Sequence, residues 1–308
     1  MKIFKPKFWQ NKLNFFSIIF LPVSVIFLIL ISIRKLITLS KKFKIPVICV
    51  GNIYIGGTGK TPLSILITNK LKKRFSPVII KKYYKNHKDE HKLIKENTDN
   101  LILNNKRTFA IEEAIRMNFN VAILDDGFQD HTIFKDLNIL CFNSKQLIGN
   151  GMIFPSGPLR EGINSLRRAK IVIINGNKNE KFEKKIMNIN NDLEIYYSKY
   201  FPLNISEFVN KKVYAFAGIG NPENFFELLK SNNLNIKKAV SFPDHYQFSK
   251  VEIQDMVDEA HKNDFVLITT EKDHQRIKEY GFKNIKFIKL ELKIFDENKF
   301  ISQILNIL

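Results

Sequence analysis

Hydrophobic residues in this chain fall into short runs that are separated by longer amphipathic stretches. The runs at residues 47–50 and 120–124 are largely apolar and rich in β-branched residues, which is typical of strands buried in a parallel sheet. After the first run, apolar residues between positions 63 and 71 recur at helical spacing. Strands that alternate with helices predict an α/β domain. Its other predicted elements are strands at residues 77–80, 137–142 and 169–175 and a helix at residues 111–117.

The periodic pattern lapses around residues 195–210 and then resumes as a second α/β series. We therefore predict a larger domain at residues 37–205 and a smaller one at residues 206–308. The polar residues 82–99 predict a loop within the larger domain. The second series consists of strands at residues 212–217, 236–242, 264–269 and 284–291 and helices at residues 222–231, 249–262 and 271–279.

Residues 15–33 form an apolar run between two basic flanks. The run is just long enough to cross a bilayer, and no small-residue cleavage site of a signal peptide follows it. Two interpretations remain open: a single spanning helix, or a helix in the interface of the inner leaflet with its lysines on anionic lipid. Either one makes residues 1–36 a membrane-associated segment.

The charge of the chain is strongly positive. Its 308 residues include 49 Lys and Arg against 30 Asp and Glu, a formal net charge of +19. Such a balance favours an anionic partner: nucleic acid, a membrane surface or a phosphorylated substrate. Because no arginine-rich groove with interleaved aromatic residues is evident, we expect no nucleic acid partner. Cys49 and Cys141 lie in apolar runs and are expected to be buried thiols in a reducing compartment.

A glycine-rich loop follows the strand at residues 47–50 and leads into a helix. Glycines let backbone N–H groups converge on phosphate oxygens, and the helix N-terminus adds donors and a positive dipole end. Lys60 is placed for the β- and γ-phosphates of ATP, and Thr61 for Mg²⁺. The alternative, a turn without a ligand, fits this strand–loop–helix context less well. The predicted nucleotide-binding residues are Tyr54, which stands where the usual first glycine would fall, Ile55, Gly56, Gly57, Thr58, Gly59, Lys60 and Thr61.

Two adjacent carboxylates, Asp125 and Asp126, follow the strand at residues 120–124. A carboxylate at the carboxyl end of a strand beside a phosphate-binding loop is the usual arrangement for holding Mg²⁺. The alternative is that both residues only begin a turn before Gly127.

Other polar residues allow two interpretations each. Arg160, Arg167 and Arg168 could bind phosphate or lie on a solvated surface. His245 follows a strand end and could share a proton, although a lone histidine in a loop is more often structural. The segment from Thr270 to Asp273 could be a helix cap and its first-turn carboxylates.

Taken in order, the motifs resemble those of the tetraacyldisaccharide 4′-kinase family, the lipid A 4′-kinases of Gram-negative bacteria. The resemblance extends from about residue 10 to residue 275. Its motifs are a basic and apolar N-terminal helix, Val-Gly-Asn-x₄-Gly-Gly-x-Gly-Lys-Thr-Pro, Asp-Asp-Gly-Phe-Gln, Gly-Pro-Leu-Arg-Glu, Ala-Gly-Ile-Gly-Asn-Pro-x-x-Phe-Phe, Asp-His and Thr-Glu-Lys-Asp.

This resemblance implies a phosphate-binding-loop domain with a parallel sheet, a smaller α/β domain, and a cleft between them that closes on nucleotide. It implies Mg²⁺-dependent transfer of the γ-phosphate of ATP to the 4′-hydroxyl of a tetraacyldisaccharide 1-phosphate in lipopolysaccharide biosynthesis. We accordingly expect a monomer at the cytoplasmic face of the bacterial inner membrane.

The resemblance also implies roles for individual residues. Asp89 matches the acid that acts as base on the 4′-hydroxyl, and His245 matches its histidine partner. Asp126 matches the acid that works with Mg²⁺ beside Thr61. The predicted substrate-side residues are Arg160, Gln129 and Asp125. The family's Ser-Arg-Gly-Tyr-Gly motif is replaced here by residues 81–85, and Lys88 stands in place of the glycine before Asp89.

One alternative function comes from a different class of protein. A membrane-tethered P-loop NTPase that switches protein partners would share the loop and the apolar N-terminus. Nucleotide hydrolysis that does not depend on a lipid acceptor would favour this alternative.

Overall fold

The computed structural model describes residues 6–11, 14–84, 88–244 and 246–308, and in it the chain divides into two compact units. The larger unit comprises Lys5–Tyr83, Thr98–Lys199 and Leu292–Leu308. The smaller unit includes Tyr84–Asn97 and Tyr200–Glu291. The predicted boundary near residue 205 therefore differs from this division in two segments, residues 84–97 and 292–308.

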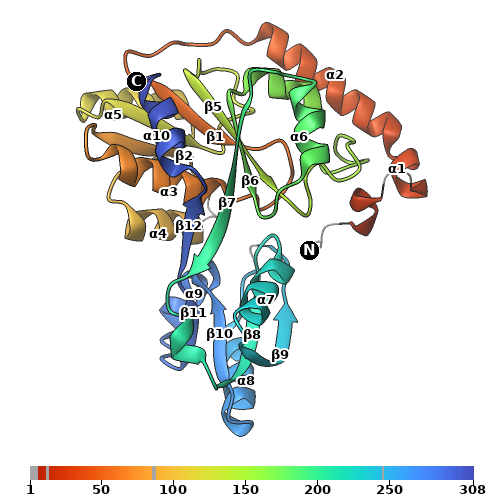
Figure 1. The fold of residues 1–308 in the computed structure, drawn as a ribbon, viewed down its shortest axis with the longest axis vertical. Helices are drawn as coiled ribbons and strands as arrows, with labels where there is room; N and C mark the ends of the chain where they lie inside the picture. The colour runs from red at the N-terminus through yellow and green to blue at the C-terminus, as the bar shows by residue number, and fades with distance from the viewer. Residues whose placement is uncertain (1–5, 12–13, 85–87, 245) are drawn as a thin grey trace. The chain divides into compact units, whose positions relative to one another are not determined.

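The larger unit is built on an eight-stranded sheet in the order β12-β7-β6-β5-β1-β4-β2-β3 (Figure 1). From β7 to β3 each neighbouring pair is parallel, which confirms the predicted parallel α/β sheet. The central strand β1 is buried along its whole length, as its apolar sequence predicts. The strands are β1 (Val47–Gly51), β2 (Pro77–Lys82), β3 (Leu101–Asn104), β4 (Val121–Asp125), β5 (Leu137–Asn143), β6 (Ile171–Asn175), β7 (Glu194–Pro202) and β12 (Leu290–Ile294).

Helices α3 (Lys60–Leu71), α5 (Arg107–Arg116), α6 (Glu180–Met187) and α10 (Glu297–Leu305) belong to the larger unit. Helix α3 buries Leu63, Ile67 and Leu71, the face that the spacing of its apolar residues predicts. Strand β7 and helix α10 were not predicted. Tyr196 of β7 packs edge-on against Phe300 of α10 with ring centroids 5.5 Å apart, a contact between residues about one hundred positions apart that no local pattern reveals.

The apolar N-terminal run forms two helices rather than one, α1 (Phe15–Ile19) and α2 (Leu21–Ile37), after the short helix η1 (Lys7–Gln10). Among the described residues, no helix combines the length and apolarity that crossing a membrane would require. Two serines of the run face protein: Ser24 Oγ donates to the carbonyl oxygen of Ile153 at 2.9 Å, and Ser17 is fully buried. The apolar side chains are largely exposed, with Leu36 84% and Phe15 71% accessible.

The smaller unit has a four-stranded parallel sheet in the order β11-β10-β8-β9. Two separate hydrophobic clusters are associated with this sheet, one including Phe225 and Leu229 and the other Phe248 and Ile253. The second predicted α/β series is thereby confirmed, except that its last predicted strand, residues 284–291, is divided between β11 of this sheet and β12 of the larger sheet. Its elements are β8 (Lys212–Ala217), α7 (Pro222–Ser231), β9 (Asn235–Ser241), α8 (Lys250–Lys262), β10 (Val266–Thr270), α9 (Glu271–Ile277) and β11 (Ile285–Ile288).

Helix α4 (Lys88–Asn97) corrects the prediction of a loop at residues 82–99. The segment follows β2 of the larger sheet in the chain, yet it packs on α9 of the smaller unit. Its helical pattern is weak because Leu93 and Ile94 are its only apolar residues. Ion pairs such as Lys92–Glu279 at 2.6 Å and Lys278–Glu96 at 3.1 Å join it to η5 (Lys278–Tyr280), the turn that follows α9.

Candidate active site

The phosphate-binding loop connects β1 to α3 in the larger unit. The side-chain amide of Asn52 lies 2.7 Å from the carbonyl oxygen of Tyr54, 3.2 Å from that of Gly56 and 2.9 Å from Thr58 Oγ1. Gly56 and Gly59 have φ angles of 132° and 92°, which side-chain-bearing residues rarely adopt. The buried Asn52 amide and these glycines therefore set the course of the loop.

Tyr54 occupies the position of the missing glycine without entering the space in front of the loop. Its side chain is fully buried, and its hydroxyl accepts a hydrogen bond from Gln10 Nε2 at 2.8 Å. Burial raises the pKa of Tyr54 to about 12. The backbone N–H of Ile55 donates to the carbonyl oxygen of Pro158 at 2.8 Å, so the Gly-Pro-Leu-Arg-Glu segment lies against the loop.

Asp125 lies at the end of β4, directly beside the last residues of β1. It is fully buried, and its Oδ2 accepts a 2.9 Å hydrogen bond from Thr61 Oγ1 and pairs with the ammonium of Lys81. Its Oδ1 is also buried and, among the described residues, has no hydrogen-bond partner. The substrate contact that the sequence predicted for Asp125 stays a prediction.

Asp126 adopts a left-handed backbone conformation with φ 58°. Arg107 Nη2 donates to its carbonyl oxygen at 2.7 Å, and this contact supports the unusual turn. Its carboxylate lies 2.8 Å from Arg160 Nη1 and 3.7 Å from Lys60 Nζ. Desolvation by burial raises the pKa of Asp126. The charges of Lys60, Arg160 and Lys81 outweigh this effect and bring the pKa well below its usual value.

Oxygen donors suited to Mg²⁺ meet at this point. Among the described residues, no group of three or more His, Cys, Asp or Glu could hold a metal ion by itself. Mg²⁺, however, commonly binds one or two protein oxygens together with substrate phosphates and water. The unsatisfied Oδ1 of Asp125, the hydroxyl of Thr61 and the carboxylate of Asp126 fit such a site.

Gln129 links the phosphate-binding loop to the Arg160 segment. Its Nε2 donates to the carbonyl oxygen of Asn52 at 2.9 Å, and its Oε1 accepts from Arg160 Nη1 at 3.4 Å. Nearby, Arg168 pairs with Glu161 and lies 4.1 Å from the ring centroid of Phe128. Arg168 is therefore anchored within the larger unit by a carboxylate and an aromatic ring, and its binding of phosphate stays a prediction.

The lowered pKa of His131 makes the folding stability of the protein depend on pH. Desolvation and the nearby charges of Arg168 and Lys135, with smaller contributions from Lys35 and Arg34, lower the pKa of His131 to about 4. An unfolded chain binds a proton at a histidine near pH 6.5, whereas the folded protein resists this protonation until about pH 4. Stability from this source is therefore complete above pH ~6.5 and decreases as the pH falls towards 4.

We expect His131→Gln to make the urea midpoint less sensitive to a change from pH 7.5 to 5.0 than it is in the wild type. The exposed histidine variant His261→Gln serves as the control and should follow the wild type. An equal loss of stability on acidification in the wild type and in His131→Gln would contradict the argument.

Asp89, the predicted base, is not part of the phosphate-binding loop's unit. Asp89 is a residue of α4 in the smaller unit, where its carboxylate accepts hydrogen bonds from Arg276. His245 lies outside the described residues.

The sequence analysis missed three residues that organise the site: Asn52, Lys81 and Arg107. A lysine at the end of an apolar strand was a usable signal, because the register of β2 against β4 places Lys81 directly opposite Asp125. Asn52 and Arg107 act on backbone carbonyl groups, and such contacts leave no spacing pattern in a sequence.

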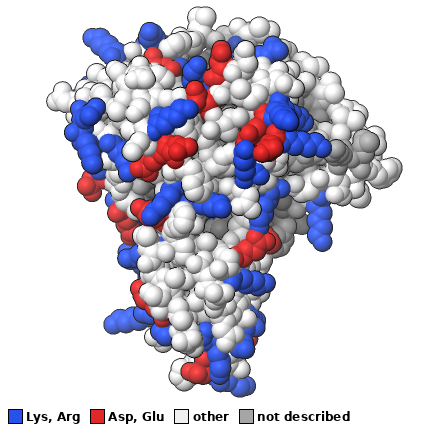
Figure 2. All heavy atoms as spheres, in the orientation of Figure 1, with Lys and Arg blue, Asp and Glu red and all other residues white. Residues whose placement is uncertain are grey.

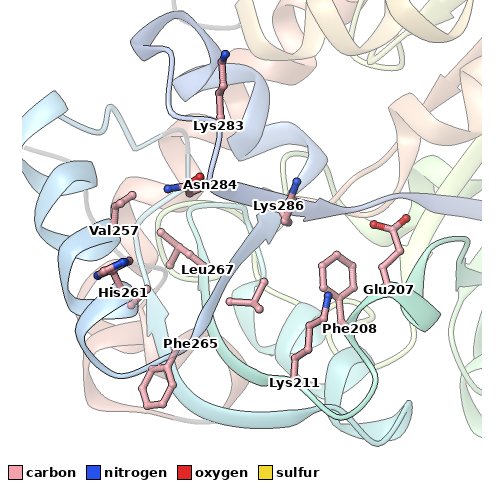
Figure 3. A pocket seen from close by; sticks show the side chains of 12 residues that line it. Glu207, Phe208, Lys211, Val257, His261, Phe265, Leu267, Lys283, Asn284 and Lys286 are labelled. Carbon is pink, nitrogen blue, oxygen red and sulfur yellow. The ribbon is translucent and has the colours of Figure 1, made fainter.

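A cavity of about 340 Å³ lies elsewhere, in the smaller unit (Figure 3). Its lining includes Phe208, His261, Lys283 and Lys286. None of the predicted site residues lines this cavity, so the candidate site rests on the phosphate-binding loop and the carboxylates beside it.

The parallel sheet, with Lys60 and Thr61 at a strand–helix junction and a carboxylate on the adjacent strand, defines a P-loop nucleotide-binding protein. The model of the tetraacyldisaccharide-1-P 4′-kinase family matches residues 16–308. The chain belongs to this family and is a kinase.

Individual relatives agree with this assignment. A tetraacyldisaccharide 4′-kinase of Pelagibacter ubique is 44% identical over 312 residues, which cover 100% of this chain and 99% of the relative. One from Rickettsia canadensis is 35% identical, with 97% and 95% covered. A crystal structure of LpxK from Aquifex aeolicus, described as a complex with ATP, has a TM-score of 0.70 at 26% identity and covers 94% of this chain and 99% of that one.

Proposed function

We propose that the protein transfers the γ-phosphate of ATP to the 4′-hydroxyl of a tetraacyldisaccharide 1-phosphate, a precursor of lipid A. The observation that carries this proposal is a phosphate-binding loop, with Lys60 and Arg160 beside the Asp126 carboxylate, in a chain of this kinase family. The relative from Aquifex aeolicus, described as an ATP complex, supports ATP as the donor.

Phosphoryl transfer depends mainly on positioning and on neutralising charge. Lys60 and Arg160 now pair with Asp126, and we assign both cations to the γ-phosphate when ATP is bound. The residues from Tyr54 to Thr61 would hold the nucleotide, and Gln129 would support Arg160 from the side.

Mg²⁺ is the proposed metal, and Thr61 and Asp126 are its proposed protein ligands. When bound, Mg²⁺ would neutralise charge on the phosphates. Asp125, buried behind Thr61, would orient the threonine hydroxyl through the 2.9 Å hydrogen bond. Asp89, with His245 as its partner, is the proposed base that takes the proton of the acceptor hydroxyl.

Helices α1 and α2 are the proposed membrane contact. Their apolar side chains are exposed on the side away from Ser17 and Ser24, and Arg34 and Lys35 lie in the last turn of α2. In Figure 2 the surface at the upper right, where these helices lie, carries few charged side chains. Because ATP is cytoplasmic, we place this contact on the cytoplasmic face of the inner membrane.

We expect the protein to float with anionic vesicles and to float more weakly with zwitterionic ones.

The decisive test follows labelled γ-phosphate from ATP into a tetraacyldisaccharide 1-phosphate in detergent micelles. We expect a labelled lipid that requires both the acceptor and Mg²⁺. Membership of the kinase family disfavours the NTPase switch. Steady ATP hydrolysis without acceptor, together with an unlabelled lipid, would reverse that preference.

A further inference from the structure

The carboxylate of Asp89 is held by two cations of the smaller unit. Its Oδ2 accepts hydrogen bonds from Arg276 Nε at 3.0 Å and from Arg276 Nη2 at 2.7 Å. Lys272 Nζ lies 3.7 Å from the same oxygen. The side chains of Asp89 and Arg276 are only 2% and 5% exposed, so solvent screens this pair weakly.

Arg276 is itself held in place on its other edge. Its Nη1 donates to the carbonyl oxygen of Gly218 at 2.6 Å and also pairs with Asp273. Asp273, which is fully buried, accepts hydrogen bonds from the backbone N–H of Gly218 at 2.9 Å and from Thr270 Oγ1 at 2.7 Å. Gly218 and Asp273 therefore fix the orientation of the guanidinium group whose other nitrogen atoms contact Asp89.

These contacts explain two motifs that the proposed mechanism leaves unused. The Thr-Glu-Lys-Asp segment supplies Thr270, Lys272 and Asp273, and the Ala-Gly-Ile-Gly-Asn-Pro segment supplies Gly218. A Cβ atom at Gly218 would lie 3.2 Å from Asp273 Oδ1 and 3.3 Å from Phe248 Cζ, so the backbone approaches Asp273 closely where no side chain intervenes. The helix-cap interpretation of Thr270 is correct, since Asp273 N–H donates to Thr270 Oγ1 at 3.1 Å, but it covers only part of what this segment does.

Lys272 contributes the second positive charge. It lies 2.9 Å from Glu90 and 3.8 Å from Asp244. Desolvation by burial lowers the pKa of Lys272. The carboxylates of Glu90, Asp244 and Asp89 outweigh this effect and raise the pKa above its usual value, so the lysine is charged at neutral pH. Among the described residues, the charged groups found near Asp89 include the cations Arg276 and Lys272 and the carboxylates of Glu90, Asp244 and Asp273.

We propose that Arg276 is a positioning residue for the phosphoryl transfer, because it holds Asp89 ionised and correctly oriented to take the proton of the acceptor hydroxyl. This inference rests on the proposed function and on the role of Asp89 within it. In that step the hydroxyl oxygen bonds to the γ-phosphorus, the bond from this phosphorus to the β–γ bridging oxygen breaks, and ADP leaves. The hydroxyl proton passes to Asp89.

A paired carboxylate suits this step. In a loose phosphoryl-transfer transition state, the hydroxyl needs orientation and an acceptor for its proton more than it needs a strong base. The contacts also mean that Asp89 is fixed by the smaller unit, whereas the phosphate-binding loop belongs to the larger one.

The test compares Arg276→Gln and Arg276→Lys with the wild type in the lipid phosphorylation assay across pH. We expect Arg276→Gln to lower kcat about 10- to 100-fold with little change in the KM for ATP, because the base is misplaced and the nucleotide site is intact. The acidic limb of its kcat/KM profile should move to higher pH, because a carboxylate without its cation is protonated more easily. Arg276→Lys, which keeps the charge, should retain the wild-type limb and recover part of kcat. The matched control Lys262→Gln removes an exposed charge at the end of α8 and should behave as the wild type.

A double variant separates positioning from a loss of fold. If Arg276 acts through Asp89, Arg276→Gln should change kcat less than about twofold in an Asp89→Asn background. Fully additive effects, or an unmoved acidic limb in Arg276→Gln, would overturn the proposal. A wild-type protein that labels no lipid would instead refute the proposed function. Labelled lipid with wild-type kcat in Asp89→Asn would keep the kinase and refute both the base and its positioning residue.

Discussion

Replacing Lys60 with alanine should reduce kcat for lipid phosphorylation by about 100- to 1,000-fold, the range expected when one preorganised charge that stabilises a transition state is lost. Lys60 begins α3 at the end of the phosphate-binding loop, and its ammonium lies 3.7 Å from the Asp126 carboxylate. Because Arg160 still pairs with Asp126 at 2.8 Å, the variant keeps a partner for that carboxylate. Quantifying labelled lipid at saturating ATP measures the effect.

The control for this experiment is Lys73→Ala, which removes an exposed lysine shortly after the same helix. It should leave kcat within about twofold of the wild type, since surface substitutions away from a site have small effects. A folded Lys60→Ala variant with wild-type kcat would mean that the loop does not bind the transferred phosphate.

Asp125→Asn should lower the free energy of unfolding of the larger unit by about 3–5 kcal/mol, because it removes the negative charge of Asp125 from beside the buried Lys81 ammonium. The side chains of Lys81 and Asp125 are 6% and 0% exposed, respectively. The substitution also weakens the support of Thr61, so kcat should fall as well. Urea unfolding followed by circular dichroism, together with the lipid assay, measures both effects.

Two further variants make this result specific. Glu112→Gln breaks an ion pair between exposed side chains of the same unit and should cost at most about 1 kcal/mol. Adding Lys81→Met to Asp125→Asn should recover stability without recovering activity, because it removes the buried charge but not the defect at Thr61. An Asp125→Asn protein as stable as the wild type would show that the Lys81 pair is unimportant.

Local signals account for what the sequence predicted well. The strand–loop–helix pattern identified the phosphate-binding loop, because glycines, a lysine and a threonine act there within ten residues of one another. The apolar run before Asp125 and Asp126 predicted a buried strand, and the buried strand β4 confirms this prediction. In a parallel sheet the carboxyl ends of adjacent strands share one edge, so these carboxylates were expected beside the loop.

Weaker local signals led to errors. Helix α4 has few apolar residues and is held by ion pairs to α9 and to the turn that follows it, so its sequence resembled that of a loop. The apolar run at residues 15–33 suggested one long helix, but the chain forms α1 and α2 with Pro22 at the start of the second. Ser24 and Ser17 of this run contact Ile153 and Asn150 respectively, which lie about 130 residues away in the chain.

The sequence by itself determined the α/β class, the course of the phosphate-binding loop and the family, because each depends on residues that act close together in the chain. Only the tertiary structure decided that Lys81 is the buried partner of Asp125, that α4 belongs to the smaller unit, and that Arg276 pairs with Asp89. The physical reason is the same in all three cases. Desolvated charges need a counter-charge, and the fold supplies it from residues 44 positions away for Lys81 and 187 positions away for Arg276.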